Sequence, residues 1–542
     1  MKKLFLSLIS LALAASTYAI PNTFKEGDVI SAEQMNENFQ ALEQQFRGAR
    51  SIKVDCAAGE KINDAIENGF SDITVSGTCT ENLLYAVLPL MVNDGDPNFR
   101  DNTKLAPRYL KITGADSTAK IQDATSQAKS TIYMNSGTTL LLDNITISGG
   151  LYGISVTRNS NLLMSGVTIE NFNEMGVRLS DNAWLGVDDG GIIVNGDGSG
   201  SGIVLGSGPT AWIHRFSISG VQIGLEAGAG STVLTGGYTI SASDVGLRII
   251  DSQFLQYGGS GRDGKITGTS GAAIWVFQGI FNVWDPGALE LHDLIGGRGI
   301  DLWESKASIN NLKLLAFDNT GSGWNPALQL SGGSSAYING AVISGSTDGA
   351  LISISDGSIT KIENSTLTVG SASNAIDAYG STRLVLRNSN ISGSVTDDLV
   401  NIDQGSTAQI RNSSSISGSV GGALVSTSHG SSSDIRDSTF TLNSGNRALA
   451  VKESSNLEMW NSTLSGTATE QLVDVRRLSN AIIRNESKLS QSGSDTPDVR
   501  VSNLSFLSVW SDSSINSVDC HMKGTVSADE GTVTTLSSSC TE

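Results

Sequence analysis

The side chains best suited to chemistry gather between Gly246 and Ala327, a stretch that holds four of the eight tryptophans. Sugar rings have apolar faces, so exposed indole rings can serve as stacking platforms for a glycan. Arg248, His292 and Asp301 are the candidates for catalysis in the same stretch. The candidate ligand-binding tryptophans are Trp275, Trp284, Trp303 and Trp324.

Two kinds of polysaccharide chemistry could use such a stretch. A lyase needs a base and a group, Arg or Ca²⁺, that neutralises a uronate carboxylate. A hydrolase needs two carboxyl groups about 5 to 9 Å apart. Binding without catalysis needs only the aromatic platform, and ordinary irregular loops would have a similar composition. All of these interpretations stay open at this point, with binding preferred.

A second candidate binding site is a basic column formed by Arg387, Arg411, Arg436 and Arg484. In a repeat protein, its members would lie about 5 Å apart in adjacent coils. Their charges must therefore be neutralised, either by nearby acids or by an anionic glycan or phosphate-rich surface. The acids available for internal neutralisation are Asp377, Asp398, Asp403 and Asp474.

No bound metal and no organic cofactor are expected. The four histidines, His214, His292, His429 and His521, show no zinc-ligand spacing. The sequence has no P-loop, dinucleotide fingerprint or nucleophile elbow. Ca²⁺ enters only if the protein is a lyase.

These side chains belong to a repeating sequence pattern. A short signature, small–apolar–x–apolar, recurs from Thr131 to Asp498, a span of 367 residues in 15 steps of about 24.5 residues. Each repeat alternates apolar and polar residues briefly and then breaks at Gly, Ser or Asn, which indicates short strands and tight turns. In three successive repeats the outward position holds Arg248, Trp275 and Asp301, which would therefore stack on one face.

A second signature, apolar–x–Asn–Ser–x–apolar, marks one corner of the later repeats. Stacked Asn side chains can hydrogen-bond to one another and tolerate the backbone conformations of turns, so we assign this column a structural role. Its members, spaced 24 or 25 residues apart, are Asn364, Asn388, Asn412, Asp437, Asn461 and Asn485.

One repeat cannot bury its own apolar face, whereas stacked repeats can. The sequence therefore predicts an all-β parallel solenoid of about 16 or more coils, roughly 70 Å long at the usual strand spacing. The steps are longest, at 27, 26 and 28 residues, between Gly246 and Ala327, and long loops on a rigid scaffold often carry function.

The first 19 residues have the form of a signal peptide, with a basic start, an apolar stretch and a small–x–small cleavage site ending at Ala19. We expect a secreted protein, extracellular or at the cell surface, with the periplasm as an alternative. Cysteine spacing favours two bridges, Cys56–Cys79 and Cys520–Cys540, which would staple the two ends; free thiols are the alternative.

Residues 20–50 have a different period. Ser31 and Gln34 look like a capping box, and Met35, Phe39, Leu42 and Phe46 then follow a 4-3-4 spacing. The sequence predicts a short amphipathic helix there, too short to be stable alone. It would pack across the open end of the solenoid or associate with copies of itself.

The chain resembles the pectin lyase-like superfamily of right-handed parallel β-helix proteins. The resemblance rests on the segment from Cys56 to Cys79, with its helix-like Ile62 to Ile66, and on the coil repeat to about residue 520. It implies a right-handed coil. The superfamily includes lyases, hydrolases, adhesins and phage tailspikes, so the resemblance does not choose a function. The Asn-Thr-Asp, Gly-His-Gly and Arg-Ile-Lys strings of the hydrolases are absent.

These observations divide the chain into five parts: a signal peptide (1–19), a leader (20–50), an N-terminal cap with irregular coils (51–130), the β-helix (131–520) and a C-terminal cap (521–542). The formal charge of −19 argues against nucleic acid as a partner. No stretch predicts a membrane span. The sequence favours a rod that binds a polysaccharide or cell-surface glycan in an adhesive or structural role; a polysaccharide lyase or hydrolase with its site in residues 246–327 is the alternative.

Overall fold

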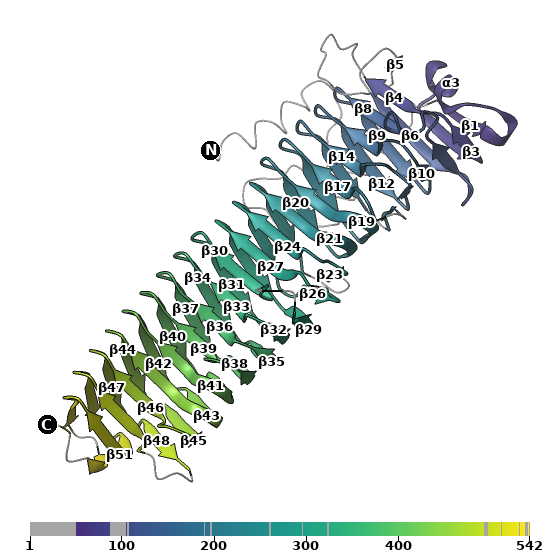
Figure 1. The fold of residues 1–542 in the computed structure, drawn as a ribbon. Helices are drawn as coiled ribbons and strands as arrows, with labels where there is room; N and C mark the ends of the chain where they lie inside the picture. Colours follow the sequence, from purple (N-terminus) through teal and green to yellow (C-terminus); the bar gives the residue numbers. More distant parts are fainter. Residues whose placement is uncertain are drawn as a thin grey trace, which may run out of the picture.

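The protein is a long rod of stacked coils, seen in a computed structural model (Figure 1). Coordinates describe residues 50–86, 104–105, 108–188, 190–195, 198–258, 262–294, 296–321, 323, 325–492, 497–510, 512–529, 532–536 and 540. Within these residues the chain is an all-β parallel solenoid of about 18 turns, which confirms the predicted fold class. The leader and its expected helix lie outside the described residues. No described helix is long and apolar enough to cross a membrane.

Each coil contributes strands to three parallel faces that run along the rod. Face 1 is a sheet of 20 strands. Its strands are β1 (Ser51–Asp55), β2 (Asp72–Ser76), β6 (Tyr109–Gly114), β9 (Thr139–Asp143), β12 (Asn161–Ser165), β15 (Trp184–Val187), β18 (Thr210–Ile213), β20 (Thr232–Thr235), β22 (Gln253–Gln256), β25 (Ile280–Val283), β28 (Lys306–Asn310), β31 (Ser335–Asn339), β34 (Ile359–Glu363), β37 (Arg383–Arg387), β40 (Thr407–Arg411), β42 (Ser432–Arg436), β44 (Asn456–Trp460), β47 (Asn480–Arg484), β50 (Phe506–Trp510) and β52 (Thr525–Asp529).

Faces 2 and 3 share one sheet of 33 strands, because some long strands bend from face 2 into face 3. The bent strands are β19 (Phe216–Ala227), β21 (Tyr238–Ile250), β41 (Ser415–Thr427), β43 (Thr439–Lys452) and β51 (Ser514–His521). The others on face 2 are β3 (Thr78–Thr80), β7 (Lys120–Gln122), β10 (Thr146–Ser148), β13 (Thr168–Glu170), β16 (Ile192–Val194), β23 (Gly264–Thr267), β26 (Leu289–His292), β29 (Leu312–Asn319), β32 (Val342–Thr347), β35 (Thr366–Ala372), β38 (Asn390–Val395), β45 (Thr463–Ala468), β48 (Lys488–Gln491) and β53 (Thr532–Leu536). The others on face 3 are β4 (Leu83–Ala86), β5 (Lys104–Leu105), β8 (Ile132–Asn135), β11 (Tyr152–Val156), β14 (Met175–Leu179), β17 (Ser201–Leu205), β24 (Ala272–Phe277), β27 (Arg298–Trp303), β30 (Leu328–Ser331), β33 (Ala350–Ile354), β36 (Asn374–Ala378), β39 (Val400–Ile402), β46 (Val473–Arg476) and β49 (Val499–Ser502).

The small residue of the repeat signature sits where faces 2 and 3 approach each other. A Cβ added to Gly224 would lie 2.3 Å from Cγ2 of Ile240, and one added to Gly202 would lie 2.5 Å from the carbonyl oxygen of Gly224. Both distances are shorter than real carbon contacts allow. In these coils the signature therefore begins with glycine because the stacked backbones leave no room for a larger residue.

The predicted Asn column is confirmed as a ladder at the corner between faces 1 and 2. All six of its members have φ between 43° and 58°, in the left-handed region that Asn tolerates. The Nδ2 of Asn388 donates to Oδ1 of Asn364 at 2.8 Å, and Asn364 donates to Asn339 at 2.7 Å. Nδ2 of Asn461 donates to Asp437 at 2.7 Å. The column is therefore part of the scaffold.

A buried serine column at the corner between faces 3 and 1 was not predicted. The backbone N–H of Ser406 donates to Oγ of Ser431 at 3.1 Å, and Ser431 N–H donates to Ser455 Oγ at 3.2 Å. The same bond joins Ser455 to Ser479 at 3.2 Å. Because a buried N–H needs a partner, each hydroxyl fixes the axial position of the preceding coil.

Both predicted disulfides are present, Cys56–Cys79 and Cys520–Cys540, one near each end of the described rod. At the N-terminal end the short helices η2 (Cys56–Ala58) and α3 (Ile62–Glu67) precede β2 in the chain, and α3 lies at the end of the rod (Figure 1). Ile62, Ala65 and Ile66 of α3 are buried in the core. The predicted short helix after Cys56 is thus confirmed, and it closes the core at this end.

Candidate functional site

Face 3 brings together three residues that the sequence had placed on one face. Arg248 in β21 pairs in register with Trp275 in β24, and Trp275 pairs with Asp301 in β27. Their side chains point outward because the residues on either side, such as Ile274 and Val276, are fully buried. Arg248, Trp275 and Asp301 therefore form one column across three coils.

Arg248 is held between an acid and an aromatic ring. Its guanidinium lies 3.6 Å from a carboxylate oxygen of Glu226, the preceding member of the column. Its Cζ lies 5.0 Å from the ring centroid of Trp275, within the range of a cation–π contact. The long side chain is thus fixed in place before any ligand arrives, which lowers the entropic cost of binding.

Asp301 is buried next to a single cation. Its Oδ2 lies 2.5 Å from the Arg298 guanidinium, and its side chain is 8 % exposed. Burial raises the pKa of Asp301, although the neighbouring Arg298 acts in the opposite direction. Asp301 therefore serves as a fixed anchor for Arg298 beside the indole of Trp275.

An aromatic platform extends this column toward the corner with face 1. The rings of Trp275 and Phe277 lie 6.4 Å apart, and Phe277 pairs in register with Trp303. The Trp303 side chain is exposed, and its Nε1 donates to Glu304 at 3.3 Å. Gln278 donates to the same carboxylate at 2.7 Å. We call Trp275, Phe277 and Trp303 the face 3 platform.

Other predicted members of the site lie elsewhere. His292 is on face 2, where its Nε2 lies 3.5 Å from Glu290. Trp284 follows β25 of face 1 and packs against Tyr257, with ring centroids 4.9 Å apart. Trp324 lies outside the described residues. The platform therefore contains two of the predicted tryptophans and gains Phe277, which the sequence interpretation missed.

The column is a poor arrangement for two-carboxylate hydrolysis. Glu226 and Asp301 are its two acids, and three coil steps of about 4.8 Å put them about 14 Å apart. Hydrolases require roughly 5 to 9.5 Å between the two groups. The platform's geometry therefore favours binding over this reaction.

The predicted basic column is on face 1 and is neutralised internally. Arg387 lies 3.5 Å from Glu363, and Arg436 lies 2.7 Å from Asp434, which also pairs with Arg411. The acids are thus members of face 1 itself. The proposed neutralising acids Asp377, Asp398, Asp403 and Asp474 instead lie on face 3 or its edges, so that part of the interpretation is wrong.

Residues 298–464 match the family described as "Right handed beta helix region". The rod is a right-handed parallel β-helix. No curated protein matches the sequence. The β-helix fold is shared by adhesive, structural and enzymatic proteins, so the match establishes the architecture and leaves function to the side chains on its faces.

A group of acids on face 3 of the β-helix was not recognised as a site from the sequence. Asp377 accepts from Nδ2 of Asn401 at 2.9 Å, and Asp398 accepts from the backbone N–H of Ala423 at 2.6 Å. Asp403 accepts from Ser428 at 2.9 Å. The available signal was their position: Asp377 occupies the same outward position as Asp301, three repeats later.

Burial raises the pKa of Asp377, and the charges of Asp403 and Asp397 add to that shift. The folded state then holds this proton more tightly than the unfolded state. The stabilising effect is fully present below the unfolded pKa, about 4, and is lost as pH rises through the folded value. Asp377→Asn is therefore expected to be at least as stable as the parent at pH 7, with the difference closing near pH 4.

Thermal unfolding midpoints of both proteins at pH 4 and pH 7 test this. Asp251→Asn changes an exposed carboxylate and is the control, with little expected shift at either pH. A clear loss of stability in Asp377→Asn at pH 7 would contradict the assignment.

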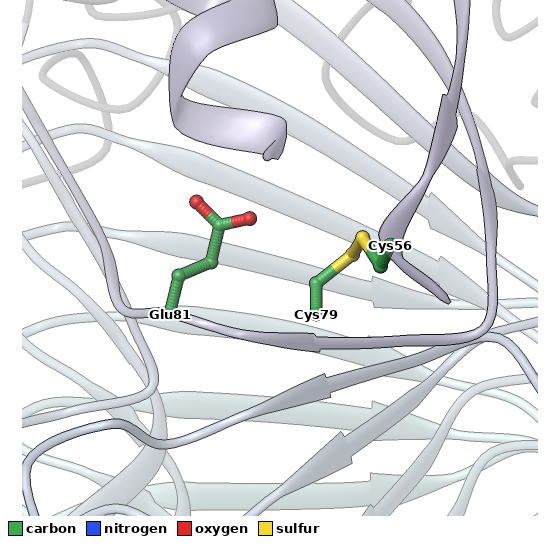
Figure 2. Close-up of side chains that lie close together, drawn as sticks. All are labelled: Cys56, Cys79 and Glu81. Atoms are coloured by element: carbon green, nitrogen blue, oxygen red, sulfur yellow. A yellow bond between two sulfur atoms is a disulfide. The ribbon is translucent and has the colours of Figure 1, made fainter. Parts of the chain in front are cut away.

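The described residues contain one group of three potential metal ligands, Cys56, Cys79 and Glu81 (Figure 2). The two sulfurs are bonded to each other, so they offer no thiolate to a metal. The Glu81 carboxylate accepts from the backbone N–H groups of Ile62 at 2.7 Å and Asn63 at 3.0 Å. This group therefore caps the first turn of α3 and ties it to β3.

Proposed function

We propose that this β-helix is a secreted rod that binds a glycan, or a glycan-bearing surface, through the face 3 platform. The observation that carries the proposal is the stacking of Arg248, Trp275 and Asp301 in one column, with Phe277 and Trp303 beside it. Aromatic rings offer stacking surfaces for sugar rings, and the fixed arginine and carboxylates offer directional hydrogen bonds.

Secretion is supported by the signal-like first 19 residues and by the two disulfides, which form and persist in oxidising compartments. The shape of the rod supports an adhesive or structural role (Figure 1). A long, rigid rod can hold a lateral binding surface away from the point where the protein is attached. Ca²⁺ would be bound only if the protein is a lyase.

The test is a binding screen of the chain from residue 20 to 542 against neutral and anionic polysaccharides. Trp275→Ala is expected to weaken binding roughly 30-fold, the loss of about 2 kcal/mol typical of a central aromatic anchor. Trp284→Ala, on another face, is the matched control and should bind like the parent. Equal binding by Trp275→Ala, Trp303→Ala and the parent would overturn the platform as the site.

Hydrolysis is the second candidate function. The acids of face 3, and not the platform, support it. Asn401 pairs in register with Asp377, and Asp403 follows two residues later. Asp403 thus lies one strand across from Asp377 and two residues along, so the two Cα atoms are about 8 Å apart. At that distance the two carboxyl groups can reach the separation that a hydrolase needs. Release of reducing ends that stops in both Asp377→Asn and Asp403→Asn, while Trp275→Ala retains it, would support this function. Release of unsaturated ends that requires Ca²⁺ would indicate a lyase instead.

A further inference from the structure

An outward column of face 1 is apolar where the strand pleat should present polar residues. Successive strands from β9 to β22 pair in register at this position. All the apolar side chains are partly exposed, and Trp184 covers the single glycine, since a Cβ on Gly186 would lie 2.4 Å from its ring. We call the column the leucine stripe; it consists of Leu141, Leu163, Gly186, Trp212, Leu234 and Leu255.

The stripe has defined ends. The strand before it places Lys111 in the same column, and the strand after it places Asn282 there. Farther along the rod, the same column holds no second run of apolar residues in the described coils: Tyr337, Val385 and Ile482 each stand between polar or charged neighbours. An apolar stripe of this kind on a rod of net charge −19 signals a surface that is covered by something.

The chain enters the fold in the same column as the leucine stripe, before the first leucine. Ser51, the first residue of β1, pairs with Asp72, Asp72 pairs with Lys111, and Lys111 pairs with Leu141. Everything before residue 50 therefore joins the rod in the column of the leucine stripe, three coil steps from its first residue.

The segment before β1 has the matching pattern and length. Met35, Phe39, Leu42 and Phe46 have the spacing of a narrow apolar seam, one side chain wide. As a helix, residues 31–46 would be about 24 Å long at 1.5 Å per residue. The stripe spans five coil steps, also about 24 Å.

The connection is long enough. Residues 47–50 can span up to about 14 Å when extended, and the three steps from β1 to β9 also cover about 14 Å. The column beside the stripe on one side is uncharged, so the acidic residues of the segment meet no like charge there; its members are Thr139, Asn161, Trp184, Thr210, Thr232 and Gln253.

We propose that residues 31–46 form a helix that lies along the leucine stripe, with Phe46 near Leu141 and Met35 toward Leu234. The segment thus covers the side of the rod. The other expected place, the open end of the solenoid, is already closed by α3, whose Ile62 and Ile66 are buried in the core.

Engineered disulfides test the position. In the chain from residue 20 to 542, Leu42→Cys with Leu163→Cys should form a bond within one chain, roughly tenfold more than Leu42→Cys with Ser417→Cys, because docking raises the effective concentration of the first pair. Ser417 lies on face 2 and is the control. Non-reducing peptide mass spectrometry of the monomer fraction measures both. Bonds between two chains, or equal yields for the two pairs, would overturn the proposal.

A second measurement requires no new cysteines. Leu234→Asp should release the segment and raise the rate of tryptic cleavage after Arg47 several-fold, whereas Gln409→Asp, in the same column beyond the stripe, should not. Both positions face outward, so neither change alters the core. Equal cleavage rates in the two variants and the parent would also overturn the proposal.

Discussion

Asp474→Ala is expected to cost about 1.5 to 3 kcal/mol, because it removes the buried counter-charge of Arg447 and leaves the more exposed Glu470 as the partner of that arginine. The Asp474 side chain is 2 % exposed and lies 3.1 Å from Nε of Arg447 and 3.4 Å from Nε of Arg476. The Arg447 side chain is itself only 12 % exposed. Surface ion pairs, by contrast, contribute about 0 to 1 kcal/mol.

Hydrogen exchange of the neighbouring strands measures this loss, because a solenoid's stability is a sum of contributions from each coil and its neighbours. Amides of β43 and β46 should exchange faster in Asp474→Ala. Adding Arg447→Met should restore part of the protection, since the buried arginine that lost Asp474 is then gone. Asp434→Ala, which breaks the two ion pairs with Arg411 and Arg436 on face 1, where the carboxylate is more exposed to solvent, is the control. An equal effect from Asp434→Ala would contradict the argument.

Removing the N-terminal disulfide is expected to cost about 3 kcal/mol in the first coil. The bond closes a loop between Cys56 and Cys79, 23 residues apart, and a loop of that size restricts the unfolded chain by roughly this amount. The same bond holds η2 against β3, beside the Glu81 cap of α3.

The matched experiment measures hydrogen exchange in the parent and in the variant that carries both Cys56→Ala and Cys79→Ala. Peptides from residues 51–80 should lose protection, and peptides from residues 374–402 should not, because each coil contacts only its neighbours. Uniform loss of protection along the whole rod would show that the coils unfold as one unit and would contradict this prediction.

The architecture could be predicted because its determinants are local and recur. The same side chains return every 24 or 25 residues, so one position repeated in successive coils must stack, as Asn364 and Asn388 do. The same reasoning correctly placed Arg248, Trp275 and Asp301 in one column. Phe277 could have been added, since it is the next outward residue after Trp275.

The sequence could not predict which columns of residues lie on the same face of the rod. The repeat length gives the number of residues per coil and leaves open where the chain turns, so His292 and Trp284 were grouped with residues on another face. The acids that neutralise the arginine column were missed although one of them, Asp434, lies two residues before Arg436 in the same strand, where both side chains are on the same face. The buried serine column was missed because serine is common at surface turns.

The direction of the backbone hydrogen bonds has a mechanical consequence. In the described coils these bonds join one strand to the next along the rod, so a pull on the two ends of the chain loads the coils one at a time. Unwinding must then start at a terminal coil. Each terminal coil carries its own covalent bond, Cys56–Cys79 or Cys520–Cys540, so tension passes through that bond and cannot extend the residues between the two cysteines unless the bond breaks.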